Sequence, residues 1–195
     1  AQPRLVYVCT PANPTGRCIA LDTLAQLAER HRDTTWIVDL SFSSLSAAHR
    51  HDAVLASDRI VWLRSLTKDL ALAGLRLGFL VAPTELAAAL EANRPPWSVN
   101  AMAQAAALAA TTEETQAFVV RSRLQLLADR THLDAALVRL GLHVHPSETI
   151  FSLVDLGPTR HATEVRERML ARHAVLVRDC TSFGLPHHVR LGARP

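Results

Sequence analysis

The first half of the chain alternates short apolar runs with helical patterns. Apolar runs bounded by turn-forming residues predict buried strands. These runs lie at residues 5–9, 36–39, 60–63 and 77–82. Apolar or alanine-rich helical patterns lie at residues 22–32, 83–91 and 101–110. Strands that alternate with helices in this way predict an α/β fold, with a mostly parallel sheet that helices cover on both faces.

The second half of the chain has a different pattern. An amphipathic repeat across residues 114–140 predicts one long helix. Further strands are expected at residues 142–145, 150–154, 175–177 and 189–191, with a helix at 163–172. We therefore expect residues 1–115 to be part of a large domain, and residues 116–195 to be a hinge helix with a smaller α+β domain. Because strands are predicted so close to both ends, we expect a fragment that lacks an N-terminal part.

The composition narrows the class of protein. Of 195 residues, 49% are hydrophobic, which is enough for a packed core, and no apolar run is long enough to cross a membrane. The net charge of +3 is small and the basic residues are scattered, so we expect no nucleic-acid partner. Three cysteines at unrelated spacings favour a reducing cytoplasm over a disulfide framework. His143 and His145 lack a third ligand at a suitable spacing, so no metal site is expected.

Lysine is almost absent from the sequence. Lys68 is the only lysine among the 21 lysine and arginine residues. Arginine can replace lysine as a solvated cation, but not where the amine must lose its proton and act as a nucleophile or base. A single lysine is also what an arginine-rich composition would leave on a surface, so the neighbours of Lys68 decide between the two interpretations.

Three polar residues follow three successive predicted strands. Asn13 lies after the first strand, Asp39 ends the second and Lys68 comes just beyond the third. Ligands of open α/β sheets bind at the carboxyl ends of parallel strands, so we expect these side chains to converge. An amide, an acid and a lysine in one crevice suit a cofactor that carries a phenolic oxygen, a pyridine nitrogen and an aldehyde. That description fits pyridoxal phosphate.

Groups suited to a phosphate lie on both sides of the lysine. Ser65 and Thr67 precede Lys68, and Arg76 follows it within the segment Ala-Gly-Leu-Arg-Leu-Gly. Hydroxyls beside a guanidinium can bind the oxygens of a phosphate group. We therefore include Ser65, Thr67 and Arg76 among the candidate cofactor-binding residues.

These motifs together resemble the fold-type-I pyridoxal-phosphate enzymes, the aspartate aminotransferase superfamily. The resemblance implies a three-layer sandwich in which Lys68 holds the cofactor as a Schiff base and Asp39 pairs with its ring nitrogen. The Asn-Pro-Thr-Gly turn at residues 13–16 resembles the family turn whose asparagine binds the phenolic oxygen. Arg76 matches the phosphate-binding arginine, and Arg190 resembles the late arginine that binds the substrate carboxylate.

A narrower resemblance concerns the substrate. The segments 64–68, 74–80, 96–101 and 177–184 resemble the L-threonine-O-3-phosphate decarboxylases of cobalamin biosynthesis, which are close to the histidinol-phosphate aminotransferases. In both groups an arginine at the position of Arg178 is implied to contact the substrate phosphate. We expect decarboxylation of threonine phosphate to aminopropanol phosphate. The alternatives are a histidinol-phosphate-type aminotransferase that uses a 2-oxo acid, and a non-catalytic sensing module of the same fold.

One position departs from the family pattern. Where relatives often carry Asp-Glu-Ala-Tyr, this chain has Asp39-Leu-Ser-Phe42. Phe42 has no hydroxyl to donate to the phenolic oxygen of the cofactor, so Asn13 would hold that oxygen alone. The resemblance further implies a small phosphorylated amino acid or amino alcohol as substrate, and a homodimer, because relatives build each site at a two-fold interface.

Overall fold

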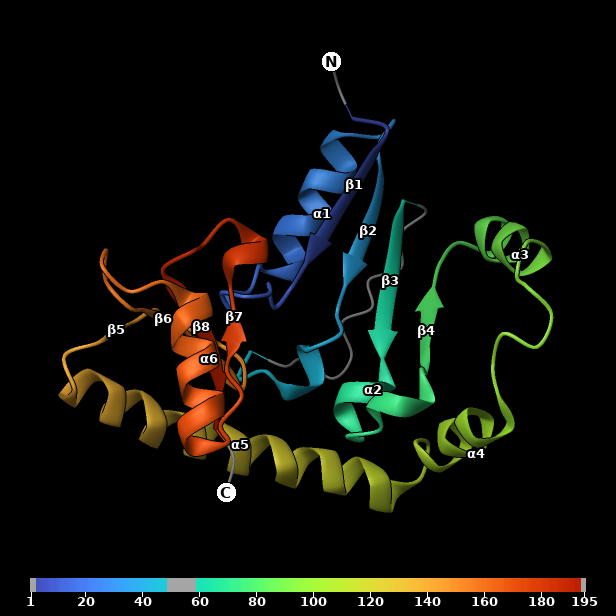
Figure 1. Cartoon of the computed structure of the whole chain (residues 1–195). Coiled ribbons are helices and arrows are strands. Elements are labelled where there is room, and N and C mark those ends of the chain that lie inside the picture. Colours follow the sequence, from blue (N-terminus) through green and yellow to red (C-terminus); the bar gives the residue numbers. More distant parts are fainter. Residues whose placement is uncertain (1–2, 49–58, 194–195) are drawn as a thin grey trace. The chain divides into compact units, whose positions relative to one another are not determined.

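The computed structural model describes residues 3–48 and 59–193, which fall into two compact units (Figure 1). The first unit comprises Ala1–Pro11 and Cys18–Arg121, and the second comprises Ala12–Arg17 and Ser122–Pro195. The division lies within the long helix Glu113–Arg139, and the turn Ala12–Arg17 joins the second unit. The reason is a main-chain contact, since the amide of Glu148 donates a hydrogen bond of 2.8 Å to the carbonyl of Gly16.

A four-stranded sheet forms the centre of the first unit. Its strands are β1 (Leu5–Cys9), β2 (Thr35–Asp39), β3 (Ile60–Ser65) and β4 (Gly78–Val81), in the order β1-β2-β3-β4. The first three strands are parallel, and β4 pairs antiparallel with β3. The sequence therefore predicts the strands and their mainly parallel arrangement correctly. Because β1, β2 and β3 run in one direction, their carboxyl ends lie at one edge of the sheet.

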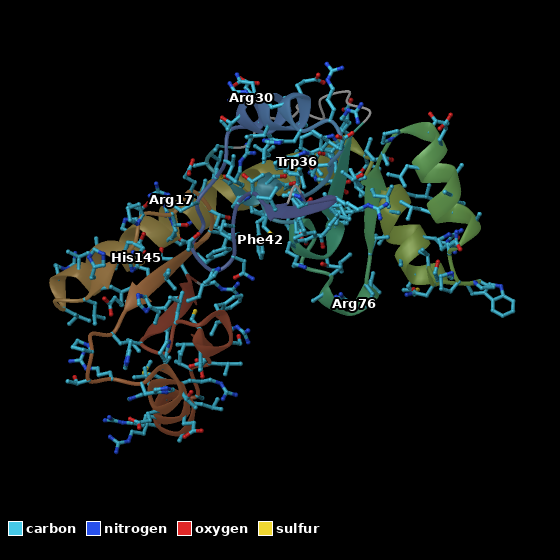
Figure 2. The ribbon with its side chains drawn as sticks, turned by 90° about the horizontal axis from the view of Figure 1, so that it is seen from above. Arg17, Arg30, Trp36, Phe42, Arg76 and His145 are labelled. Atoms are coloured by element: carbon cyan, nitrogen blue, oxygen red, sulfur yellow. The ribbon has the colours of Figure 1, made fainter. Side chains whose placement is uncertain are left out.

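The core of the first unit lies between the sheet and helix α1 (Leu21–Arg30). Alternate residues of the strands, Trp36, Val38 and Trp62 among them, are buried against Leu24 and its neighbours on α1, and Figure 2 shows Trp36 beneath that helix. On the opposite face of β1, the side chains of Leu5 and Tyr7 are about half exposed, and Cys9 is partly buried.

Shorter elements follow the strands of the first unit, and two of them, α2 and η2, position the candidate residues Lys68 and Arg76. They are η1 (Ser43–Leu45), α2 (Leu66–Asp69), η2 (Ala73–Leu75), α3 (Thr84–Ala92) and α4 (Ala101–Ala109). The predicted helices at 83–91 and 101–110 correspond to α3 and α4. Asn100 caps α4, because its side chain accepts a hydrogen bond from the amide of Ala103.

The second unit contains an antiparallel sheet with helices on one face. Its elements are β5 (His143–Val144), β6 (Phe151–Asp155), α6 (Ala162–His173), β7 (Arg178–Asp179), η3 (Thr181–Phe183) and β8 (His188–Gly192), which follow α5 (Glu113–Arg139). The strand order is β5-β6-β8-β7. The core side chains Val154 and Val189 pack with Ala162 of α6 and Leu137 of α5. Among the helices that the structure describes, none has the length and apolar character needed to span a membrane.

The strand predicted at residues 175–177 is wrong. The helix α6 ends at His173, and the strand β7 begins only at Arg178. The residues between them close the end of the helix and do not pair in the sheet. Ala174 adopts a left-handed conformation, with φ of 54°, and the amide of Val175 donates to the carbonyl of Met169 in the last turn of the helix. Val177 is apolar because it joins the core of the second unit, and not because it pairs in the sheet.

Candidate active site

Lys68 lies on the short helix α2, directly after β3, and its side chain is exposed. Its Nζ makes long hydrogen bonds of 3.3 Å to Thr67 Oγ1 and 3.4 Å to Ser65 Oγ. The two hydroxyls lie 2.7 Å apart, and Nζ is 6.0 Å from the ring centre of Phe42. Within residues 3–48 and 59–193, Lys68 takes part in no salt bridge. Its amine is therefore accessible, with neutral hydroxyls as its immediate neighbours.

Asp39 ends β2 on the sheet face opposite α1. Its Oδ1 accepts a hydrogen bond of 2.8 Å from the amide of Ser41, and its Oδ2 accepts one of 2.5 Å from the hydroxyl of Tyr7. Burial raises the pKa of Asp39, but these hydrogen bonds and the charge of Lys68 outweigh burial, so the net pKa lies below the ordinary value. Asp39 is thus an anion at neutral pH, close enough to Lys68 to feel its charge.

Tyr7 is a site neighbour that the motifs do not reveal. It lies on β1, where Cys9 is the register partner of Asp39, so Tyr7 and Asp39 project from the same face of neighbouring strands. Burial, followed by the hydrogen bond to Asp39 and its charge, raises the pKa of Tyr7 well above its usual value. The phenol therefore remains a proton donor to the carboxylate at every physiological pH. Strand alternation is the only sequence signal for this pair.

Arg76 ends η2 in a left-handed conformation, with φ of 55°. Its exposed guanidinium donates a hydrogen bond of 3.0 Å from Nη1 to the carbonyl of Ala73, within its own turn. Nearby, the side-chain amide of Asn100 donates to the carbonyl of Leu75. The turn that carries Arg76 is therefore tied to α4, and the phosphate-binding role of Arg76 stays a prediction.

Asn13 belongs to the second unit, where it meets Arg190. The Nη1 of Arg190 donates a hydrogen bond of 2.6 Å to Oδ1 of Asn13, although 177 positions separate them in the chain. The guanidinium of Arg190 also lies 4.8 Å above the ring centre of Phe151. The sequence groups Asn13 with Asp39 and Lys68, and that convergence remains a prediction, whereas the contact with Arg190 is the one that the structure provides.

Arg178 and Arg190 are neighbours across the sheet of the second unit. They are register partners on the antiparallel strands β7 and β8, so both side chains project from the same face. Like charges directly opposite each other are unfavourable, and an anion bound between them would relieve the repulsion. Burial and the charge of Arg178 lower the pKa of Arg190, although nearby Cys180 opposes this shift. This face is therefore suited to anionic ligands.

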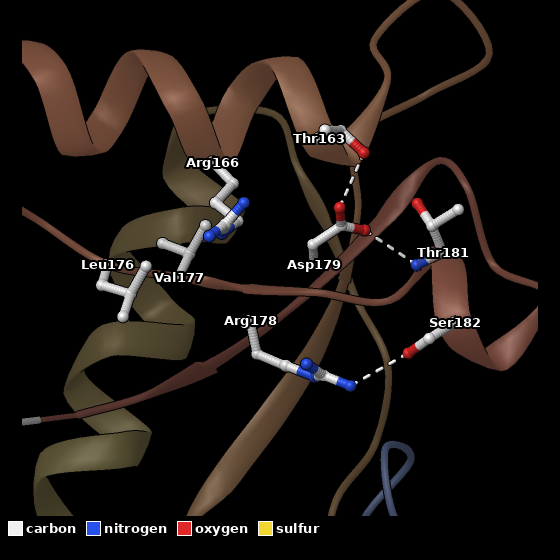
Figure 3. Close-up of a pocket in the computed structure, with 8 residues that line it drawn as sticks. All are labelled: Thr163, Arg166, Leu176, Val177, Arg178, Asp179, Thr181 and Ser182. Atoms are coloured by element: carbon white, nitrogen blue, oxygen red, sulfur yellow. Dashed lines mark hydrogen bonds between the residues drawn. The ribbon is translucent and has the colours of Figure 1, made fainter.

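A pocket of about 750 Å³ lies at the edge strand β7 (Figure 3). It is lined by Arg166 of α6 and by Arg178, with Asp179 and the hydroxyl side chains Thr163, Thr181 and Ser182 among the other lining residues. In the first unit, a larger cavity of about 1150 Å³ is lined by Asp39, Ser41 and Arg64 together with apolar residues of β4 and α3. Each unit thus offers space beside its own candidate residues.

The groups in the first unit fit pyridoxal phosphate. Asp39 is held ionised by two hydrogen bonds, as a partner for a protonated ring nitrogen must be. Lys68 offers an accessible primary amine that no carboxylate neutralises among the described residues, as a Schiff-base lysine must. Ser65 and Thr67 place two hydroxyls beside that amine. The donor set therefore matches the cofactor that the sequence predicts.

Comparison with known proteins supports the same assignment. The sequence profile of the family described as aminotransferase class I and II matches residues 1–194. The chain belongs to this family. The superfamily inferred from the motifs is therefore confirmed, and so is its α/β fold.

Three relatives illustrate what this aminotransferase-family chain is similar to. The histidinol-phosphate aminotransferase of Symbiobacterium thermophilum is 39% identical across 96% of this chain and 52% of its own length. Among solved structures, L-threonine-O-3-phosphate decarboxylase from Porphyromonas gingivalis has a TM-score of 0.80 at 28% identity, with 98% of this chain and 59% of that chain covered. The histidinol-phosphate aminotransferase of Sinorhizobium meliloti, solved with pyridoxal-5'-phosphate, has a TM-score of 0.84 at 22% identity, with 98% and 53% covered. The chain spans about half the length of the curated relatives it matches.

Proposed function

We propose that the protein is a pyridoxal-phosphate-dependent aminotransferase that acts on a small phosphorylated amine of the histidinol-phosphate type. The observation that carries the proposal is the carboxylate of Asp39, held by hydrogen bonds from Tyr7 and Ser41 in the same unit as Lys68, the only lysine of the chain. The 39% identity to a histidinol-phosphate aminotransferase favours this activity over decarboxylation, which the motifs place first. A homodimer in the cytoplasm is part of the same proposal.

In this proposal Asp39 binds the ring nitrogen of the cofactor, and Ser65, Thr67 and Arg76 bind its phosphate. When bound, pyridoxal phosphate supplies an electron-accepting ring for the electron pair released at the substrate α-carbon. Asp39 holds the proton on the ring nitrogen, because Tyr7 and Ser41 keep its carboxylate anionic. Lys68 anchors the cofactor through its amine and moves the proton at the α-carbon.

The arginines of the second unit orient the substrates. Arg178 binds the phosphate of the amine, and Arg190 binds the carboxylate of the 2-oxo acid that accepts the amino group. Asn13 holds one edge of the Arg190 guanidinium through the 2.6 Å hydrogen bond and is also the predicted ligand of the phenolic oxygen.

A second candidate function is decarboxylation of L-threonine O-3-phosphate, as in cobalamin biosynthesis. The pairing of Arg178 with Arg190 favours it, because this substrate carries a phosphate and a carboxylate on one small molecule. The structural similarity to the Porphyromonas gingivalis decarboxylase adds support. The two candidates differ in which bond to the substrate α-carbon would break, the bond to hydrogen in the aminotransferase and the bond to the carboxylate in the decarboxylase.

One assay separates these candidates. The protein, supplied with pyridoxal phosphate, is incubated with histidinol phosphate plus 2-oxoglutarate, and separately with threonine phosphate alone. Glutamate formed only in the first mixture supports the aminotransferase, whereas carbon dioxide from the second supports the decarboxylase. Cofactor absorbance that depends on Lys68 without turnover of either substrate would favour a sensing module. An absorbance band typical of the lysine-bound cofactor that persists in Lys68→Ala would contradict all three functions.

A further inference from the structure

Arg178 occupies an unfavourable place for a binding residue. It lies on the two-residue edge strand β7, its side chain is exposed, and Arg190 is directly opposite. A long exposed side chain loses conformational entropy when it binds a ligand, and the neighbouring positive charge favours orientations that turn away from the anion. The guanidinium of Arg178 therefore needs other groups to hold it in place before a ligand arrives.

The 3-10 helix η3 supplies two such groups. Nη2 of Arg178 donates a hydrogen bond of 2.9 Å to Oγ of Ser182, and its guanidinium lies 5.3 Å from the ring centre of Phe183. Figure 3 shows the bond to Ser182 at the pocket. These contacts use one edge and one face of the guanidinium, so its remaining N–H groups stay available to an anion.

Asp179 fastens η3 to the start of α6. One carboxylate oxygen accepts a hydrogen bond of 2.8 Å from the amide of Thr181, and the other accepts one of 2.7 Å from the hydroxyl of Thr163. Figure 3 shows both bonds. Hydrogen bonds from Thr181 and Thr163 lower the pKa of Asp179 to about 2. Both oxygens of the carboxylate thus accept hydrogen bonds from Thr163 and Thr181. Among the described residues, Asp179 forms no salt bridge with Arg178.

We propose that Asp179 and Ser182 are positioning residues that preorganise Arg178 for a phosphate group and so set the preference for phosphorylated substrates. This inference rests on the proposed function, because it takes Arg178 as the phosphate ligand. Ser182 orients the guanidinium directly, and Asp179 acts through η3, which it ties to Thr163. Arg166 lines the same pocket and adds a second positive charge, so the pocket keeps a net charge of +1 with Asp179 ionised.

The test measures substrate selectivity as the ratio of kcat/KM for histidinol phosphate to kcat/KM for histidinol. Ser182→Ala and Asp179→Asn are each expected to lower this ratio about tenfold, because kcat/KM falls much more for histidinol phosphate than for histidinol. Thr163→Val, which removes the second anchor of Asp179, is expected to act in the same direction. A purely structural role would lower activity toward both substrates alike and leave the ratio where it was.

A matched control comes from the first unit. Arg94 donates a hydrogen bond of 2.9 Å to Ser98, an arginine–serine pair four residues apart like Arg178 and Ser182. Ser98→Ala should leave the selectivity ratio unchanged. A readout independent of turnover is the affinity for inorganic phosphate of the protein saturated with pyridoxal phosphate, measured by titration calorimetry, which should weaken in Ser182→Ala and Arg178→Met but not in Ser98→Ala.

The outcomes distinguish the proposed substrate class from the positioning role of Asp179 and Ser182. If the wild-type protein does not prefer the phosphorylated substrate and binds no phosphate through Arg178, the proposed substrate class is wrong and the inference falls with it. If the wild type discriminates and loses selectivity in Arg178→Met, yet Ser182→Ala and Asp179→Asn retain it, only the positioning role is overturned. Should Asp179→Asn fail to fold in thermal unfolding, Ser182→Ala decides alone, because its exposed hydroxyl holds no other element in place.

Discussion

In the first unit the polar groups of the candidate site lie at the ends of parallel strands, whereas in the second they lie on one face of an antiparallel sheet. The first arrangement brings together an acid, a phenol and an amine, namely Asp39, Tyr7 and Lys68. The second brings together two cations, Arg178 and Arg190. Groups suited to covalent and proton chemistry therefore belong to the first unit, and groups suited to binding anionic substrates belong to the second. Substitutions in the first unit should change kcat, and substitutions in the second should change KM.

The largest effect is expected for Lys68→Arg. Arginine keeps the positive charge but cannot deliver an unprotonated amine at neutral pH, so turnover should fall by about a thousandfold or more. Absorbance spectroscopy should show that the lysine-bound form of the cofactor is lost, while thermal unfolding stays close to that of the wild type because the side chain is exposed. Retention of more than a tenth of the activity would contradict the role of Lys68.

The next effect concerns Asp39→Asn. The amide cannot stabilise a protonated ring nitrogen, so kcat should fall by about a hundredfold with a much smaller change in KM. Steady-state kinetics with both substrates provides the measurement. A change confined to KM would place Asp39 outside the chemistry and remove the contrast between the two units.

Tyr7→Phe tests the same carboxylate with a smaller change, because it removes one hydrogen bond to Asp39 and keeps the carboxylate itself. Loss of the phenol removes one of the hydrogen bonds that lower the pKa of Asp39, so that pKa should rise and the acidic limb of the kcat profile should shift to higher pH. The rate at neutral pH should fall by less than about tenfold. A shift to lower pH would show that Tyr7 does not support the ionised form.

In the second unit, Arg190→Met should raise KM for the 2-oxo acid by about ten- to a hundredfold and change kcat far less. The methionine also removes the hydrogen bond to Asn13, whereas Asn13→Ala removes that bond together with the predicted contact to the cofactor. Initial rates at varied 2-oxo acid concentration provide the measurement. An equal loss of kcat in Arg190→Met would mean that this residue belongs with the chemistry of the first unit.

The smallest effect concerns the stability of the second unit. Burial lowers the pKa of His145, and the charges of His143 and His188 lower it further, while Asp155 opposes them. The unfolded chain then binds the proton more readily than the folded one, so the contribution of His145 is present above its ordinary pKa of 6.5 and is lost as the pH falls through the lowered value. His145→Gln should flatten the decline in midpoint temperature below about pH 6.5. A steeper decline in the variant would reverse the assigned sign.

The sequence alone determined the elements and the main candidates of the first unit. Alternating apolar runs specify strands, and parallel connections force Asp39 and Lys68 toward the same edge of the sheet, whatever the details of packing. The uniqueness of Lys68 likewise needs no coordinates.

The tertiary structure decided which groups touch, because hydrogen-bond partners and strand register depend on residues far apart in the chain. It paired Tyr7 with Asp39, Asn13 with Arg190, and Arg178 with its cross-strand neighbour. It also placed residues 175–177 in the irregular segment between α6 and β7, since an apolar run has the same pattern whether it pairs in a sheet or only packs against one.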